Sequence, residues 1–197
     1  MSTSCAATVL GRPELAEAAG LSLFLSGKSA AKARVLPLLE LLGNTIYDLG
    51  ERVEEALVVK LGYNFLIAAA IEAMGEATAL VEHCGADRER FLSMLVDTPL
   101  FKGAVYEGYG HMIGSRDYSD ARFPVAMGLK DVELILQVAD HVDMPLPFAE
   151  IVYEHLLAAR VGGCAHEDWS VLADFVMQAA TGAAVAARAG RPGSASQ

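Results

Sequence analysis

Short apolar runs separated by turn residues mark the first fifty positions of the chain. The runs cover residues 7–10, 21–25 and 45–49, and a glycine follows each within two residues. Apolar runs of this length, ended by turn residues, are typical of strands. Residues 30–42 instead carry apolar side chains at helical spacing and end before Gly43. The pattern predicts a β-β-α-β segment that buries little apolar surface by itself.

From residue 51 onward the apolar positions follow a helical period. Residues 51–84 contain no proline and only two glycines, which predicts one helix of about 30 residues and about 45 Å. Further helices are predicted over residues 87–96, 101–112, 125–142 and 148–161, with a last short one from 167. The expected fold is mainly α: a helical domain (51–178) built on the long helix, a truncated α/β remnant before it (1–50), and a flexible tail (179–197).

Composition narrows the classes of partner. The chain is 53% hydrophobic with a net charge of −10, so it can supply a core and would repel a nucleic acid backbone. The apolar run at 65–74 is shorter than the roughly 20 residues of a membrane span. Three cysteines without a CxxC pair or a Cys/His cluster indicate no metal site and a reduced, cytoplasmic compartment. We therefore expect neither a nucleic acid nor a membrane as partner.

Lys60 and Asn64 are the residues with the clearest chemical potential. They are four positions apart on the predicted long helix, so both side chains project from one face. A lysine on an apolar face can act as a general acid or base, and an asparagine one turn away can hold a substrate hydroxyl or carbonyl. Spacing alone favours a plainer alternative, in which Lys60 extends along the helix to water and Asn64 faces solvent.

A series of short blocks along the chain changes this balance. The blocks are Gly50, Lys60, Asn64, Gly75-Glu76-Ala77, Gly85-Ala86-Asp87, Lys130-Asp131, Met144-Pro145-Leu146-Pro147 and Asp168-Trp169-Ser170. Their order and spacing resemble the helical domain of the β-hydroxyacid dehydrogenases, such as 3-hydroxyisobutyrate dehydrogenase and phosphogluconate dehydrogenase. The segment from Ala7 to Arg12 resembles the end of the family's nucleotide domain, Ala-Pro-Val-Ser-Gly-Gly, which implies that residues 1–50 are the remnant of a Rossmann-type domain. Residues 21–27 resemble its strand Leu-Thr-Ile-Met-Val-Gly-Gly, and the resemblance covers roughly residues 5–175.

The resemblance implies an NAD(P)-dependent oxidoreductase that acts on a small hydroxy acid, carbonyl or imine. It implies that Lys60 is the general acid/base, that Asn64 orients the substrate, and that Lys130 reaches the cofactor or the substrate. Gly11 and Arg12 fall in the family's substrate loop. The resemblance also implies a homodimer formed through the long helix, residues 51–84.

Two departures from the family pattern limit what the resemblance implies. No Gly-x-Gly-x-x-Gly motif follows any predicted strand, so the chain alone is expected to bind NAD or NADP poorly. The family's substrate-loop serine corresponds to Leu10, which has no hydroxyl to bind a carboxylate, although Arg12 supplies a charge nearby. The substrate class therefore stays open.

Several alternatives remain at this stage. The chain could be a non-catalytic helical dimerisation module, or Lys60 could act directly as a Schiff-base nucleophile. Lys130 could be a surface lysine paired with Asp131 or Glu133. Asp168 and Ser170 fit a helix cap better than a reacting site.

Overall fold

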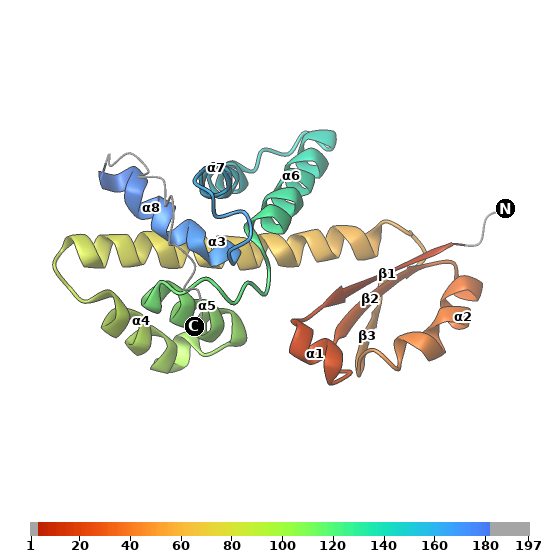
Figure 1. Ribbon diagram of the computed structural model, residues 1–197. Helices are drawn as coiled ribbons and strands as arrows, with labels where there is room; N and C mark the ends of the chain where they lie inside the picture. The colour runs from red at the N-terminus through yellow and green to blue at the C-terminus, as the bar shows by residue number, and fades with distance from the viewer. Residues whose placement is uncertain (1–3, 182–197) are drawn as a thin grey trace, which may run out of the picture. The chain divides into compact units, whose positions relative to one another are not determined.

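The chain forms two compact units, which Figure 1 shows in a computed structural model that describes residues 4–181, with side chains described to residue 176. The units are Met1–Phe65 and Leu66–Gln197, so they meet inside the longest helix. The domain boundary predicted at residue 50 stays a prediction. The predicted tail, 179–197, lies outside the described residues from 182 onward.

The first unit is a small α/β segment. Its elements are β1 (Cys5–Leu10), α1 (Pro13–Glu17), β2 (Ser22–Gly27), α2 (Ser29–Leu39), β3 (Thr45–Asp48) and the beginning of α3 (Glu55–His83). The strand order is β1-β2-β3; β2 pairs antiparallel with β1 and parallel with β3. The three predicted strands and the helix between the last two are present. The sequence pattern missed α1, a five-residue helix that begins with a proline.

The middle strand of this sheet is buried on both faces. Leu23 and Leu25 pack in a cluster with Leu39 of α2. Phe24 and Ser26 alternate with them and therefore point to the opposite face. There Phe24 stacks on Tyr63 of α3 with ring centroids 5.1 Å apart. The first turns of α3 thus cover the sheet face that α2 leaves open.

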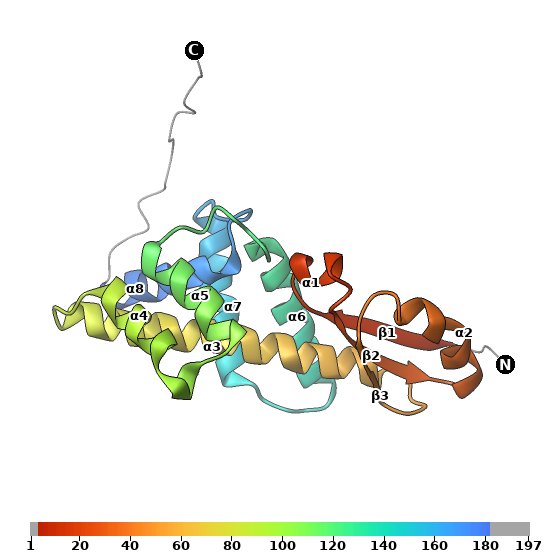
Figure 2. The same ribbon diagram turned by 90° about the horizontal axis from the view of Figure 1, so that it is seen from below.

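The second unit is built from helices. They are the rest of α3, α4 (Arg88–Asp97), the 3-10 helix η1 (Pro99–Phe101), α5 (Ala104–Ser115), α6 (Val125–His141), α7 (Pro147–Val161), the 3-10 helix η2 (Trp169–Val171) and α8 (Leu172–Thr181). In this unit α4 and α5 lie on one side of α3, and α6 and α7 lie on the other (Figures 1 and 2). Each helix predicted from periodicity is present. The predicted helix at 101–112 begins three residues later because residues 99–101 form η1.

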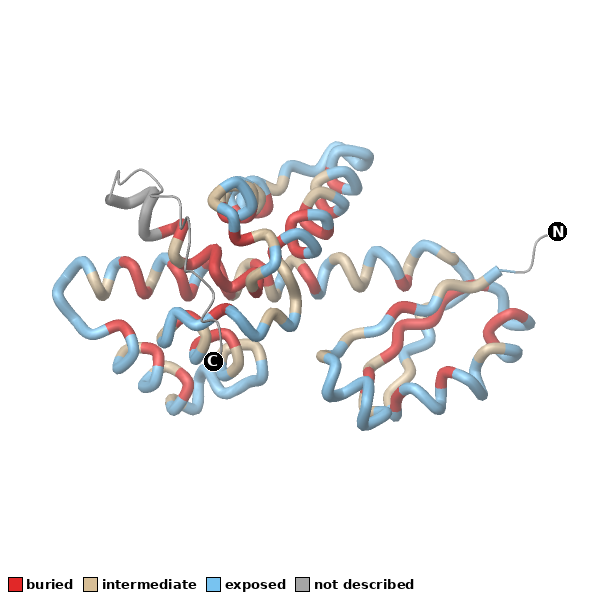
Figure 3. Tube along the Cα trace, viewed as in Figure 1, coloured by how far each residue is buried: buried red, intermediate tan, exposed pale blue. Residues whose placement is uncertain are grey.

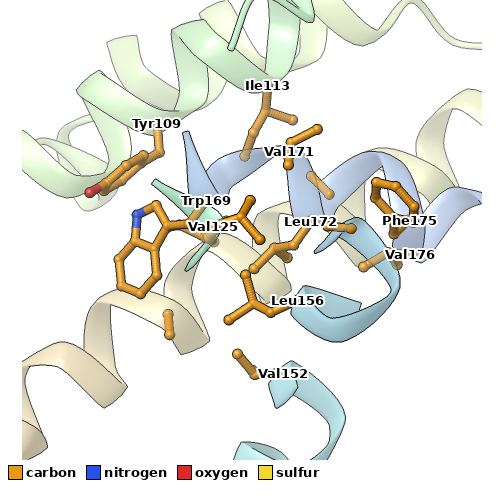
Figure 4. Close-up of a cluster of buried hydrophobic side chains, with 14 of the residues drawn as sticks. Tyr109, Ile113, Val125, Val152, Leu156, Trp169, Val171, Leu172, Phe175 and Val176 are labelled. Atoms are coloured by element: carbon orange, nitrogen blue, oxygen red, sulfur yellow. The ribbon is translucent and has the colours of Figure 1, made fainter. Parts of the chain in front are cut away.

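The core of the second unit surrounds the turn that leads into α8. Trp169 packs against Phe123 and Tyr109 in edge-to-face contacts, with ring centroids 4.7 and 6.2 Å apart, and Figure 4 shows it beside Val125. Buried residues follow the inner faces of the surrounding helices (Figure 3). By length and composition α3 could cross a membrane. Core helices of soluble proteins meet the same criteria when they are mostly buried. In α3, 28% of the apolar stretch is buried, and Ala68 and Ile71 belong to this core.

Candidate functional site

Lys60 and Asn64 lie one turn apart on α3, at the end of the first unit. Asn64 is buried, with 8% of its surface exposed, and Lys60 is half-buried. Among the residues that the structure describes, no carboxylate forms an ion pair with the Lys60 ammonium. A half-buried lysine next to a buried amide can meet a small polar molecule at one end of the helix and exchange a proton with it.

The sheet holds the beginning of the helix that carries this pair. Ser26 of β2 donates a hydrogen bond to the carbonyl oxygen of Val53 (2.8 Å) and accepts one from the amide of Ala56 (3.1 Å). Thr8 of β1 donates to the carbonyl oxygen of Ala56 (3.0 Å). The Ala56 amide is one of the first amides of α3, which have no acceptor within the helix. The Ser26 hydroxyl therefore caps α3 from a strand 30 residues earlier in the sequence.

A second set of contacts fixes the turn between β3 and α3. Gly50 has a φ of +95°, which favours glycine, and its carbonyl oxygen accepts bonds from the Gly27 amide (2.9 Å) and the Lys32 ammonium (3.2 Å). Lys32 also forms an ion pair with Asp48 at the end of β3. The hydrogen bond from Lys32 lowers the pKa of the Asp48 carboxyl. The direction of the chain into α3 is therefore set by contacts within the first unit.

Gly11 and Arg12, the predicted substrate-loop residues, form the turn between β1 and α1. Gly11 has a φ of +154° and is exposed. Arg12 is half-buried and is the N-cap of α1, where its carbonyl oxygen accepts bonds from the amides of Leu15 (3.0 Å) and Ala16 (3.2 Å). The geometry accounts for the backbone of this turn. A role in substrate binding stays a prediction.

Lys130 belongs to the second unit, on α6. Its side chain is 59% exposed and its ammonium lies 2.8 Å from the carboxylate of Asp131, the neighbouring residue. The alternative interpretation of the sequence described this pairing of an exposed Lys130 with Asp131, although Asp131 itself is buried. The role toward a cofactor, which only the family resemblance suggested, stays a prediction.

Asp168 and Ser170 form a cap, as the sequence indicated. The buried Asp168 carboxylate accepts bonds from the Ser170 amide (3.0 Å), the Ser170 hydroxyl (2.7 Å) and the Phe123 amide (3.2 Å). It is the N-cap of η2 and joins that turn to the chain before α6. These contacts give the pair a structural role.

Sequence reasoning missed a buried acid-base pair in the second unit. Glu72 of α3 is fully buried, and one of its carboxylate oxygens lies 2.7 Å from Nδ1 of His155 on α7. The hydrogen bond to Glu72 raises the pKa of the His155 imidazole. The only signal in the sequence was a glutamate inside the apolar run of α3, which needs a partner if it is buried.

Comparison with known proteins adds a family to this geometry. Residues 55–176 match the family described as the NAD-binding domain of NADP-dependent 3-hydroxyisobutyrate dehydrogenase. An uncharacterised oxidoreductase of Bacillus subtilis is 35% identical over 167 residues, which cover 85% of this chain and 58% of the relative. The 2-hydroxy-3-oxopropionate reductase of Escherichia coli is 29% identical over 152 residues, 77% of this chain and 51% of that protein.

Solved structures agree on the fold. The 3-hydroxyisobutyrate dehydrogenase of Salmonella typhimurium superimposes with a TM-score of 0.79 at 23% identity, over 88% of this chain and 60% of that one. The enzyme of the same name from Mycobacterium tuberculosis gives a TM-score of 0.73 at 19% identity, over 87% and 60%. The chain thus spans between half and three-fifths of the length of these relatives. By sequence and by fold, the chain belongs to the β-hydroxyacid dehydrogenase family of NAD(P)-dependent oxidoreductases.

Proposed function

We propose that this chain carries the proton-transfer residues of an NAD(P)-dependent oxidoreductase that interconverts a small hydroxy compound and the corresponding carbonyl, or reduces an imine. The observation that carries the proposal is the placement of Lys60 and Asn64 on one face of α3, with Asn64 buried. The family, whose named relatives are dehydrogenases and reductases, supports it. The alternative of a non-catalytic dimerisation module finds no support in these relatives.

The proposed chemistry of the chain is a proton transfer at the substrate oxygen. In the oxidative direction, the Lys60 amine takes the hydroxyl proton while the hydrogen on the adjacent carbon leaves as hydride. In the reductive direction, the ammonium returns a proton to the carbonyl oxygen. Asn64 donates or accepts a hydrogen bond at the same oxygen and so fixes its distance from Lys60. A nicotinamide cofactor would supply or take the hydride.

The chain offers residues for proton transfer beside the nicotinamide end of such a cofactor, but it lacks the usual binding turn for the pyrophosphate. A pyrophosphate is normally held by the amides of a glycine-rich strand-to-helix turn. The turn from β2 to α2 has a single glycine, Gly27, and the Glu51 carboxylate lies 3.5 Å from the Ser29 hydroxyl at the beginning of α2. The Lys28 ammonium lies 3.4 Å from the same carboxylate and compensates its charge, so what this turn lacks for a pyrophosphate is the run of glycines. We therefore derive no step at the pyrophosphate and place only the proton chemistry on this chain.

The remaining roles follow the family resemblance. We propose that Gly11 and Arg12 meet the substrate and that the Lys130 ammonium meets the cofactor or the substrate. We also propose that the protein acts in the cytoplasm as a homodimer joined through α3. Because Leu10 stands at the position of the family's serine, the substrate class is open to small carbonyl and imine compounds beyond hydroxy acids.

Turnover by point variants tests the proposal. NADPH and NADH oxidation would be followed with a panel of small aldehydes, keto acids and cyclic imines, at cofactor concentrations high enough to offset the weak binding expected of this chain alone. We expect Lys60→Ala to lower kcat by about 100-fold or more, the usual contribution of a positioned general acid. Asn64→Ala should lower kcat and raise KM together, because it orients the substrate.

Lys102→Ala provides the matched control, since Lys102 is an exposed lysine of the second unit. It should leave both constants unchanged. Wild-type kcat in the Lys60→Ala variant would contradict the proposed role. A different result would favour Schiff-base chemistry: the variant loses activity, and the wild type forms a covalent adduct at Lys60 that borohydride traps with a carbonyl substrate.

A further inference from the structure

The face of the sheet that meets α3 carries two hydroxyl groups that the family pattern lacks. Thr8 stands opposite Phe24 in the β1–β2 register, and Ser26 follows Phe24 by two positions, so all three side chains share one face. In the family pattern the positions of Thr8 and Ser26 hold proline and glycine, neither of which has a hydroxyl. Both residues are buried, and Ser26 has no exposed surface.

The two hydroxyls converge on a single residue of α3. Ser26 accepts from the amide of Ala56 (3.1 Å), and Thr8 donates to its carbonyl oxygen (3.0 Å). Ala56 itself is fully buried. In an α-helix the amide of Lys60 donates to the carbonyl oxygen of Ala56, four residues earlier. The peptide groups that set the height and rotation of Lys60 are thus tied to the sheet.

A third contact holds the other side of the same turn. Tyr63, three residues after Lys60, stacks on Phe24 at 5.1 Å with an angle of 28° between the ring planes. Lys60 is therefore flanked along the helix by two contacts that come from one face of one sheet. Buried hydrogen bonds and aromatic stacking both resist rotation of the helix about its axis.

We propose that Thr8 and Ser26 are positioning residues, which hold Lys60 at the height and rotation that proton transfer needs. The inference rests on the proposed function, because it takes Lys60 as the general acid/base. Thr8 and Ser26 act through the backbone of Ala56 and do not touch the substrate. The expected signature is a loss of kcat with little change in KM, since the substrate still binds while the reacting nitrogen is displaced.

The test uses the variants Thr8→Val and Ser26→Ala, singly and together, in the full chain. The double variant should exchange the amides of residues 57–61 about tenfold faster with deuterated water, because buried hydrogen bonds are lost. Its kcat should fall by about tenfold or more, with KM changed by less than about twofold. The rate of reductive methylation at Lys60, measured relative to Lys130, should also change.

Two further variants separate positioning from general stability. Thr8→Ser keeps the hydroxyl and should restore wild-type exchange and kcat. Thr45→Val removes a hydroxyl from the same sheet, but this hydroxyl bonds to Asn44 (3.1 Å) and not to α3. It should leave kcat and the rate of reductive methylation at Lys60 unchanged. If the double variant does not fold, Thr8→Val alone, which removes one bond, decides by the same comparison.

Unchanged exchange at residues 57–61 and unchanged kcat in folded Thr8→Val and Ser26→Ala would overturn the inference, even if the melting temperature fell. A failure of the proposed function looks different. In that case the wild type shows no turnover with any substrate, and the exchange and methylation rates of the variants still report whether the two hydroxyls hold Lys60.

Discussion

At the residue scale, the four-residue spacing of Lys60 and Asn64 predicted that they share one face of a helix. The family resemblance suggested their roles, which stay a prediction. The sequence could not identify the contact that caps the helix carrying them, or the buried acid-base pair of the second unit. Ser26 and Ala56 are 30 positions apart, and Glu72 and His155 are 83 apart. No local pattern connects such positions; only the packing of strand on helix and helix on helix brings them together.

The buried Glu72–His155 pair makes the stability of the second unit depend on pH. The hydrogen bond to Glu72 raises the pKa of His155, and the nearby carboxylates of Glu154 and Glu76 act in the same direction. Folding therefore favours the protonated imidazole. The stabilisation is complete below the ordinary histidine pKa of about 6.5 and is lost as the pH rises through the raised value.

His155→Gln tests this dependence. We expect the wild type to melt at a higher temperature than the variant near pH 6, and the difference to shrink as the pH approaches about 9. Melting curves followed by circular dichroism over this range would measure it. His111→Gln, at an exposed position on α5, is the control and should match the wild type at every pH. A difference that stays constant with pH would contradict the account.

At the element scale, periodicity predicted the long helix and its neighbours well, because apolar residues recur at a helical period over ten residues or more. Helix α1 was not predicted, because its five residues are too few to show a helical period. The pairing directions in the sheet also lie beyond the sequence pattern, since an apolar run does not indicate the orientation of its neighbours. Helices can approach closely only where their contacting residues are small. Of the two glycines of α3, one lies at such a contact with another helix and the other does not.

Gly75 and Gly62 of α3 form a matched pair for substitution. A Cβ at Gly75 would lie 2.9 Å from Cα of Ala173 on α8, so Gly75→Ala should lower the free energy of unfolding by about 1–3 kcal/mol through overpacking. Among the described residues, nothing lies within 4 Å of a Cβ at Gly62. Gly62→Ala should therefore stabilise the helix by up to about 1 kcal/mol. Urea unfolding of both variants would check the pair; equal effects would contradict the proposed contact between α3 and α8.

At the scale of the whole molecule, an apolar strip on α3 is not covered by any of the described residues. Leu66 and Leu80 are 66% and 67% exposed, and Ala73 lies exposed midway between them. Positions seven residues apart fall on nearly the same face of a helix. The strip is the surface on which the proposed homodimer would form, and neither composition nor periodicity distinguishes it from a core face.

Charged substitutions on this strip test the dimer. We expect the wild type to sediment as a dimer and Leu66→Glu with Leu80→Glu to sediment as a monomer, because two buried glutamates would face each other across the interface. Leu100→Glu is the control, since Leu100 is 88% exposed on η1, away from the strip. A monomeric wild type, or a double variant that remains dimeric, would contradict the proposed interface.

The central claim is that the Lys60 side chain moves the substrate proton, and chemical rescue tests it most directly. The Lys60→Ala variant would be assayed for cofactor-dependent turnover with increasing concentrations of methylamine or ethylamine. The account predicts that turnover is lost by about 100-fold or more and that small amines partly restore it with saturation, since they supply the missing acid and base. Wild-type turnover in Lys60→Ala without any amine would contradict the account.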